Sequence, residues 1–221
     1  MITNILINFF NYIKFSLYNL IVSKYTILLY KNFLKKIPND STVLDIGIGN
    51  AYSLVKNSDL LVKKNIKIVG IDIDQTSINQ ANILINDNKL EEYIKAKCIN
   101  IYDLNHEEKF DFVYFSNSYS VIPGIDEMIN FVSNNFLLSN GKIALSTTLD
   151  NRTNYLKEYL KPKLKNFFLG IDFGRHIIID QFLNNVVKNK LSIDNIENVY
   201  QTWVPLWGNI DIYTCFLGKE S

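Results

Sequence analysis

Three stretches of this sequence place polar side chains at the end of an apolar run, where a strand of a sheet would end. Asp45 lies near the end of one run and is followed by two glycines, Gly47 and Gly49. Asp72 ends a second run, and Ser116 follows a third. A glycine turn lets the backbone lie close to a ligand, and ionised carboxylates accept hydrogen bonds from its donor groups. In an open α/β sheet, ligands bind at the carboxyl ends of the strands, so these residues predict a binding site there.

The elements that must position these residues alternate between strand and helix. Strand-like runs cover residues 43–46, 66–72, 94–99, 112–115 and 142–147, and Ser139-Asn140-Gly141 is expected to be a turn before the last of them. Helical segments are expected at about 24–36, 52–56, from Gln75 onward with Ile78, Ala81 and Ile85 on one face, and at about 125–137. Such alternation predicts βαβ units and a parallel sheet. Residues 199–204 and 210–217 read as two further strands, joined by a hairpin loop at 205–209.

The glycine turn resembles the first motif of class I S-adenosylmethionine (SAM) dependent methyltransferases. That motif reads acid-x-Gly-x-Gly-x-Gly, and here it is Asp45-x-Gly47-x-Gly49-x-Ala51, with alanine in place of the third glycine. A dinucleotide-binding turn would instead need a glycine at Tyr52. The resemblance implies that the acid lies near the amino end of the methionine moiety of SAM. The alternative for Asp45 is a cap on the next helix.

Two further segments are similar to later motifs of this family. Asp72 ends the second strand, where the family has a carboxylate that accepts both ribose hydroxyls, and Ile73 would then lie against the adenine. Asn100 and Ile101 stand where many members place the acid that receives the adenine amino group, and Asp103 is the rival candidate. The alternative for Asp72 is a loop aspartate at a strand end. A ribose carboxylate is also typical of dinucleotide enzymes.

The residues expected around the methyl acceptor are predicted only from their positions in the expected topology. Ser116 is expected to face the reactive methyl group of the cofactor. The residues expected to line the acceptor site are Tyr119, Arg175, His176 and Trp207. His176 is the only plausible general base, and a surface or core histidine is its alternative; no catalytic residue is assigned. No metal is expected.

The resemblance implies a Rossmann-like α/β fold: a seven-stranded methyltransferase sheet, mostly parallel, with a C-terminal antiparallel hairpin and helices on both faces. We expect one domain over residues 1–221, made of an N-terminal helical lid (1–38), a SAM-binding core (40–148), and acceptor-side helices with the terminal hairpin (149–221). The net charge of +1 gives no nucleic-acid signature. Cys98 and Cys215 are expected to be buried free thiols, and the location cytoplasmic.

The N-terminal segment is unusually apolar, and two interpretations compete for it. Residues 1–34 are predicted to pack across the carboxyl edge of the sheet as a lid. Membrane contact through residues 1–22 is disfavoured, because Lys14 is the only basic residue before Lys24.

The sequence as a whole predicts a SAM-dependent methyltransferase. It would move a methyl group by in-line displacement to a small molecule or an exposed protein group. An NAD-type oxidoreductase and a catalytically silent methyltransferase-like binding subunit are the alternatives.

Overall fold

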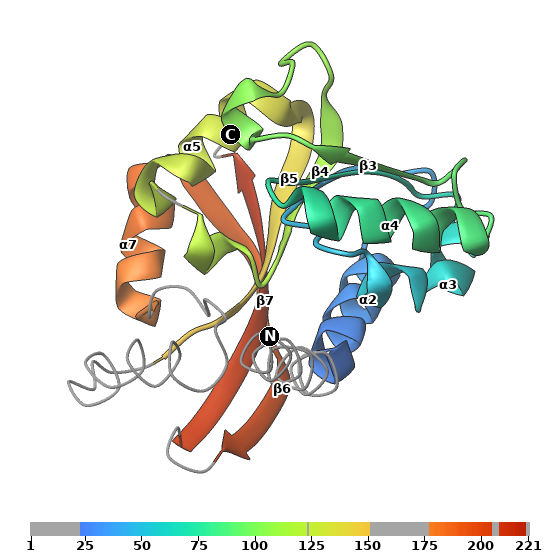
Figure 1. The fold of residues 1–221 in the computed structure, drawn as a ribbon. Helices are drawn as coiled ribbons and strands as arrows, with labels where there is room; N and C mark the ends of the chain where they lie inside the picture. Colours follow the sequence, from blue (N-terminus) through green and yellow to red (C-terminus); the bar gives the residue numbers. More distant parts are fainter. Residues whose placement is uncertain (1–22, 123, 151–176, 205–207, 220–221) are drawn as a thin grey trace, which may run out of the picture.

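The computed structural model describes residues 23–122, 124–150, 177–204 and 208–219. Within them, a seven-stranded sheet has the strand order β3-β2-β1-β4-β5-β7-β6 (Figure 1). The strands are β1 (Thr42–Ile46), β2 (Lys67–Asp72), β3 (Ile94–Cys98), β4 (Phe110–Ser116), β5 (Leu137–Thr148), β6 (Leu191–Val204) and β7 (Gly208–Lys219). Strands β1 to β5 pair in parallel, and β7 pairs antiparallel with both β5 and β6. The predicted mostly parallel sheet with a terminal antiparallel hairpin is therefore confirmed.

Helices cover both faces of this sheet (Figure 1). One face packs against α5 (Ile125–Phe136) and α7 (Ile179–Lys188). The other packs against a helix over residues 23–36, α2 (Tyr52–Val55), α3 (Ser58–Lys63) and α4 (Gln75–Asp87). Two short 3-10 helices, η1 (Ile101–Asp103) and η2 (Tyr119–Val121), follow β3 and β4.

Strand β1 lies inside the sheet, between β2 and β4, and both of its faces are apolar. Val43 belongs to the core beneath helix 23–36 and α4, and Leu44 belongs to the core beneath α5. Neither side chain is exposed to solvent. A strand covered on both faces reads as a continuous apolar run, which is how the segment reads in the sequence.

Helix α4 shows how local sequence sets an element boundary. The Asp74 side chain accepts hydrogen bonds from the backbone N–H groups of Thr76 and Ser77, which the first helical turn leaves unpaired. The predicted apolar face is buried, at Ile78, Ala81 and Ile85. The helix is thereby fixed directly after β2, next to the predicted ligand-binding edge.

Strands β5 and β6 begin earlier than the sequence predicts. Ser139-Asn140-Gly141, expected as a turn, lies inside β5, and the pairing register with β4 shifts between Phe110 and Phe112. Such an irregularity accommodates extra residues without ending the strand. Strand β6 begins at Leu191 because it follows β7 along its whole length.

Cys98 is exposed, so the expectation that both cysteines are buried is wrong for it. It ends β3, which has a sheet neighbour on one side only. Cys215 is buried, and both cysteines are free thiols.

Helix 23–36, the described part of the predicted lid, packs on a face of the sheet. The Phe33 ring is stacked on Tyr114 with 3.9 Å between centroids; it also meets Phe112 edge-on and lies nearly parallel to Phe216. Phe33 is fully buried, so burial of its ring fixes the helix there. Residues 1–22 of the predicted lid lie outside the described residues.

Candidate functional site

The turn after β1 has the backbone conformation that its glycines predict. Gly47 and Gly49 have φ angles of +84° and +59°, in the left-handed region that favours glycine. Ala51, at the third glycine position of the motif, has φ of +57°. The alanine therefore adopts the glycine-like conformation, so its substitution leaves the shape of the turn intact.

The two glycines differ in what surrounds them. A Cβ atom at Gly47 would lie 2.5 Å from Ser118 Cβ, so the segment after β4 packs directly against this residue. A Cβ at Gly49 would meet nothing within 4 Å. Gly49 therefore borders open space at the carboxyl edge, while Gly47 is needed for internal packing.

Asp72 lies beside this turn and is bound to it. Its Oδ2 accepts a hydrogen bond from Gly49 N at 2.9 Å, and its Oδ1 accepts one from Asp74 N at 2.9 Å. Each carboxylate oxygen accepts more than one hydrogen bond, so both keep capacity for a ligand hydroxyl. The next side chain, Ile73, is 76% exposed, an unusual position for a large apolar residue that a flat apolar ligand surface would cover.

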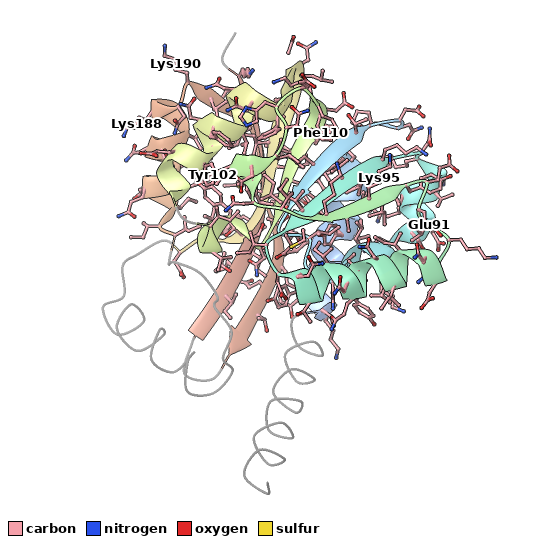
Figure 2. The ribbon with its side chains drawn as sticks, turned by 45° about the horizontal axis from the view of Figure 1, so that its top comes forward. Glu91, Lys95, Tyr102, Phe110, Lys188 and Lys190 are labelled. Atoms are coloured by element: carbon pink, nitrogen blue, oxygen red, sulfur yellow. The ribbon has the colours of Figure 1, made fainter. Side chains whose placement is uncertain are left out.

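Asn100 and Ile101 follow β3 on the same edge. The exposed Asn100 caps η1, since its Oδ1 accepts a hydrogen bond from Tyr102 N at 3.1 Å. Ile101 is buried at 4% exposure, and its side chain is part of the core beneath α5. The Tyr102 ring packs against Phe131 of α5, with 5.0 Å between ring centroids, and holds η1 in place. Tyr102 itself is labelled in Figure 2. Asp103 is exposed and follows in the same 3-10 turn.

Asp45 is fully buried and has a partner that sequence reasoning missed. Its Oδ2 accepts a hydrogen bond from the Tyr30 hydroxyl of helix 23–36 at 2.7 Å. Its Oδ1 is buried and has no hydrogen-bond partner among the described residues. The pKa of Asp45 is raised to about 7, because burial and, to a smaller extent, the charge of Asp72 raise it more than the Tyr30 hydrogen bond lowers it. Asp45 does not cap the next helix, whose N-cap residue is Ala51.

A row of buried hydroxyl groups continues from this carboxylate across the sheet. The Tyr114 hydroxyl is 2.9 Å from Ser146 Oγ, which is 2.9 Å from Thr214 Oγ1. Burial raises the pKa of both Tyr30 and Tyr114 above the ordinary tyrosine value, so neither is a base at neutral pH. Ser116 lies in this region at the end of β4, and its buried Oγ forms no hydrogen bond with a described residue.

The predicted acceptor-site residues are not brought together by the described residues. Tyr119 is 1% exposed and packs between Phe115 and Phe182 in the core. Its apolar ring follows β4 on the side that α7 covers. Arg175, His176 and Trp207 lie outside the described residues.

A groove of about 680 Å³ lies at the opposite edge, at the amino ends of the parallel strands. Its carboxylates already have partners: Asp111 accepts from the Thr42 backbone and hydroxyl, and Asp194 pairs with Lys142 at 2.6 Å. It contains none of the motif residues. Satisfied side chains at the amino edge do not suggest ligand chemistry, so the candidate site remains at the carboxyl edge.

No group of three or more His, Cys, Asp or Glu side chains in the described segments is arranged to hold a metal ion. None of the helices over these residues combines the length and apolar character needed to cross a membrane.

Comparison with known proteins identifies a matching family and a relative for most of the chain. The model of a family described as "Methyltransferase domain" matches residues 37–202. The ribosomal protein L11 methyltransferase of Alkaliphilus oremlandii (strain OhILAs) is 30% identical over 135 residues, which are 61% of this chain and 41% of that protein. The chain thus matches less than half the length of this curated relative.

Solved structures share the fold at low sequence identity. A SAM-dependent methyltransferase from Thiobacillus denitrificans, in complex with S-adenosyl-L-homocysteine, has a TM-score of 0.64 at 14% identity, covering 88% of this chain and 91% of that one. The [4+2]-cyclase SpnF has a TM-score of 0.64 at 13% identity, covering 90% of this chain and 80% of that one. These likenesses show the fold alone.

The strand order, the glycine turn with Asp72 beside it, and the family match agree with one another. Together they show that this chain belongs to the class I SAM-dependent methyltransferase family.

Proposed function

We propose that the chain binds SAM at the turn after β1 and transfers its methyl group to a small molecule or an exposed protein group. The observation that carries this proposal is the pairing of Asp72 with Gly49, next to the exposed Ile73. An acceptor-only carboxylate beside an exposed apolar side chain suits a ribose joined to a flat base. The geometry thus supports a nucleoside, and the family match supports SAM as that nucleoside.

Each motif residue has a distinct part in holding the cofactor. Asp72 accepts the ribose hydroxyls, Ile73 covers a face of the adenine, and Asn100 contacts the adenine amino group beside the backbone of Ile101. Asp45 attracts the cationic amino end from beneath the turn. Gly47 and Gly49 allow the backbone to approach, and Ser116 lies toward the reactive end.

The chemistry then depends mainly on orientation. When bound, SAM supplies an already activated methyl group on its sulfonium. The chain holds the acceptor in line with that group, and orientation alone supplies about 7–11 kcal/mol of the barrier in favourable cases. An acceptor such as a neutral amine or an ionised carboxylate needs no general base, which fits the raised pKa values of the buried tyrosines Tyr30 and Tyr114.

The acceptor side is proposed to lie between helix 23–36 and the terminal hairpin. Pairing of β5 with β7 ends at Thr148 and Ile212, while β6 and β7 continue pairing to Val204 and Gly208 (Figure 1). The hairpin therefore extends beyond the carboxyl edge. The Tyr25 ring of the helix lies 6.1 Å from Tyr200 of the hairpin. We propose that residues 1–22 continue this wall as a lid and do not serve as a membrane anchor.

The proposal extends to the kind of methyl acceptor and to the cellular location. The relative from Alkaliphilus oremlandii is named for methylation of a ribosomal protein, which keeps a protein group among the acceptors. The free thiols of Cys98 and Cys215 suit a reducing, cytoplasmic compartment.

A second candidate is a methyltransferase-like protein that does not transfer methyl groups. The likeness to the cyclase SpnF favours keeping it, because the same fold there carries another reaction. Turnover on a panel of small amines, carboxylates and ribosomal proteins separates the two: methylated product supports transfer. SAM binding without product from any acceptor favours the second candidate.

Binding of SAM is tested by calorimetry on the wild type and on Asp72→Ala. Losing hydrogen bonds to an ionised carboxylate costs roughly 1.5–3 kcal/mol, so SAM affinity should fall about tenfold to more than a hundredfold. Asp74→Ala is the matched control, because it removes a neighbouring carboxylate that caps α4. Asp74→Ala should lower stability by about 1 kcal/mol and keep SAM affinity. Unchanged affinity in a folded Asp72→Ala variant, or binding of NAD in place of SAM, would refute the assignment.

A further inference from the structure

The contact between Tyr30 and Asp45 joins the first motif to an element outside the matched family domain. The family match begins at residue 37, whereas Tyr30 lies on helix 23–36. Both side chains are buried, at 4% and 0% exposure, and the hydroxyl donates to the carboxylate at 2.7 Å. A short buried hydrogen bond to a charged group is among the stronger polar contacts in a protein.

The helix that carries Tyr30 is held in place by contacts on both sides of it. Toward the C-terminal side, Phe33 stacks on Tyr114, and the Tyr30 ring meets the same Tyr114 edge-on at 5.4 Å. Toward the N-terminal side, Thr26 Oγ1 lies 2.6 Å from Ser53 Oγ of α2. The position of the Tyr30 hydroxyl is therefore set by packing along the helix.

The hydrogen bond from Tyr30 favours the ionised form of Asp45, whereas burial favours the neutral, protonated form. Two described titratable groups act on Asp45, namely Tyr30 from the helix and Asp72 from β2, and the charge of Asp45 in turn acts on Tyr114 from β4. Of these, Asp72 repels the charge, and the Tyr30 hydrogen bond stabilises it. Only Oδ2 is engaged, since Oδ1 has no partner among the described residues. One oxygen is thus anchored to the helix, and the other keeps its capacity to accept.

We propose that Tyr30 is a positioning residue for the cofactor: it holds Asp45 ionised and oriented, so that the carboxylate attracts the cationic amino end of SAM. This inference rests on the proposed function. It makes docking of helix 23–36 a condition for tight SAM binding.

The test compares SAM affinity of the wild type and Tyr30→Phe by calorimetry from about pH 6.5 to about pH 9. Removing the hydroxyl should raise the pKa of Asp45, so the Kd of the variant should be several-fold higher than that of the wild type at neutral pH. The ratio should approach one at the highest pH, where the carboxyl is ionised in both proteins. Titration of SAM itself cancels in this ratio. Tyr25→Phe on the same helix is the matched control and should show a constant ratio.

A readout without cofactor separates this inference from the proposed function. The Asp45 carboxyl carbon is followed by NMR as pH rises, and its midpoint should move upward in Tyr30→Phe. In an Asp45→Asn background, Tyr30→Phe should leave SAM affinity unchanged, because the group that Tyr30 acts through is gone. Failure of the wild type to bind SAM would refute the proposed function. SAM binding with a Kd ratio that is the same at every pH would overturn the role of Tyr30 and leave the proposed function intact.

Tyr30→Phe keeps the aromatic ring that packs on Tyr114, so it is expected to fold. Should it not fold, Asp45→Asn alone decides the matter. Part of the pH dependence of SAM affinity should then disappear relative to the wild type, and an unchanged pH profile would overturn the inference.

Discussion

Asp45 and Asp72 are the same residue type at the same sheet edge, yet they differ in burial and in their hydrogen-bond donors. Asp72 is partly exposed and accepts hydrogen bonds from two backbone N–H groups, which stabilise a carboxylate that a ligand can still reach. Asp45 is fully buried with one donor, Tyr30. We therefore propose that Asp72 makes the direct contact with ligand hydroxyls, whereas Asp45 acts through its charge.

The buried carboxyl predicts a pH dependence of stability in the protein without cofactor. The pKa of Asp45 is raised to about 7, above its ordinary value of 3.8. The folded state then binds the proton more tightly than the unfolded state. The protonated Asp45 carboxyl therefore contributes to the free energy of unfolding below about pH 4, and this contribution is lost as pH rises to about 7. Relative to Asp45→Asn, the wild type should lose on the order of 2–4 kcal/mol of unfolding free energy between about pH 4 and pH 8.

Urea unfolding of both proteins at the two pH values measures this difference. Asp74→Asn serves as the control, because hydrogen bonds at the α4 cap lower the pKa of the fully exposed Asp74 and its effect has the opposite sign. A wild type whose stability rises from the lower to the higher pH relative to Asp45→Asn would contradict the prediction.

At the scale of elements, the turn between β1 and α2 contains two glycines that look equivalent in the sequence but have different surroundings in the structure. Gly47 and Gly49 both require positive φ, but only Gly47 is pressed against Ser118. The Ser118 hydroxyl also donates to the carbonyl of Ile46, so the segment after β4 is tied to the end of β1. The first glycine therefore serves packing, and the second serves access to the edge.

Alanine at each glycine separates these two constraints. Gly49→Ala should cost about 1–2 kcal/mol of stability from backbone strain alone and should weaken SAM binding by filling open space. Gly47→Ala should cost more, about 2–5 kcal/mol, because strain adds to overlap with Ser118. Thermal unfolding and SAM calorimetry measure both effects. Ala51→Gly is the control and should be neutral or stabilising by up to about 1 kcal/mol, because it relieves the same strain. Equal losses at Gly47 and Gly49 would contradict the assignment.

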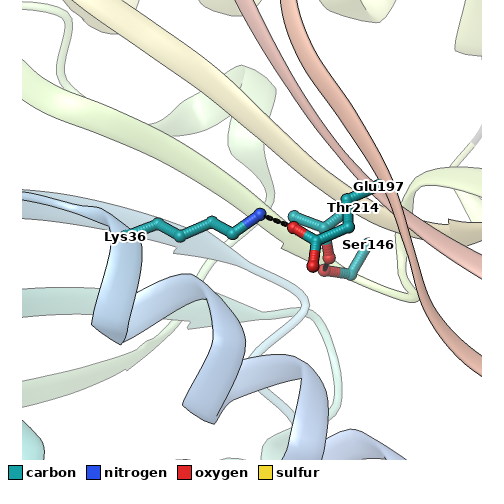
Figure 3. A network of polar contacts seen from close by, with 4 residues as sticks. All are labelled: Lys36, Ser146, Glu197 and Thr214. Carbon is teal, nitrogen blue, oxygen red and sulfur yellow. Dashed lines mark hydrogen bonds and ion pairs between the residues drawn. The ribbon is translucent and has the colours of Figure 1, made fainter.

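At the scale of the whole molecule, helix 23–36 connects the first motif to the terminal hairpin. Tyr30 reaches Asp45, and Tyr25 lies beside Tyr200 of β6. Lys36, at the other end of the helix, pairs with Glu197 of the same strand (Figure 3). The helix thus spans one face of the sheet between its central strand and its edge.

The Lys36–Glu197 pair should contribute little to stability despite its position. Its side chains are 25% and 47% exposed, and partly exposed pairs are typically worth about 0–1 kcal/mol. A double-mutant cycle with Lys36→Met and Glu197→Gln should give a coupling in that range, falling as salt rises. The more exposed pair Lys67–Glu92 is the matched control and should couple less. A coupling well above 1 kcal/mol that salt leaves unchanged would show that this pair, and not the packing of Phe33, fixes the helix.

The sequence by itself determined the order of the elements and the edge of the sheet at which the candidate site lies. Apolar runs, the glycines after Asp45 and the cap at Asp74 act between residues close in the chain, so their pattern is readable locally. The strands after the first motif, the buried face of α4 and the family were predicted from such patterns. The beginnings of β5 and β6 were missed, because pairing with neighbouring strands extends them.

Only the tertiary structure decided which polar groups meet. Tyr30 and Asp45 are 15 residues apart in the chain, and Ser118 and Ile46 are 72 apart. Burial of Tyr119 and exposure of Cys98 likewise follow from the core beneath α7 and from the edge position of β3. Burial and partner choice depend on how separate elements pack, and those properties set the charge of Asp45. The sequence therefore identified Asp45 as a candidate residue, and the packing of helix 23–36 against the sheet determined its hydrogen-bond partner and its tendency to ionise.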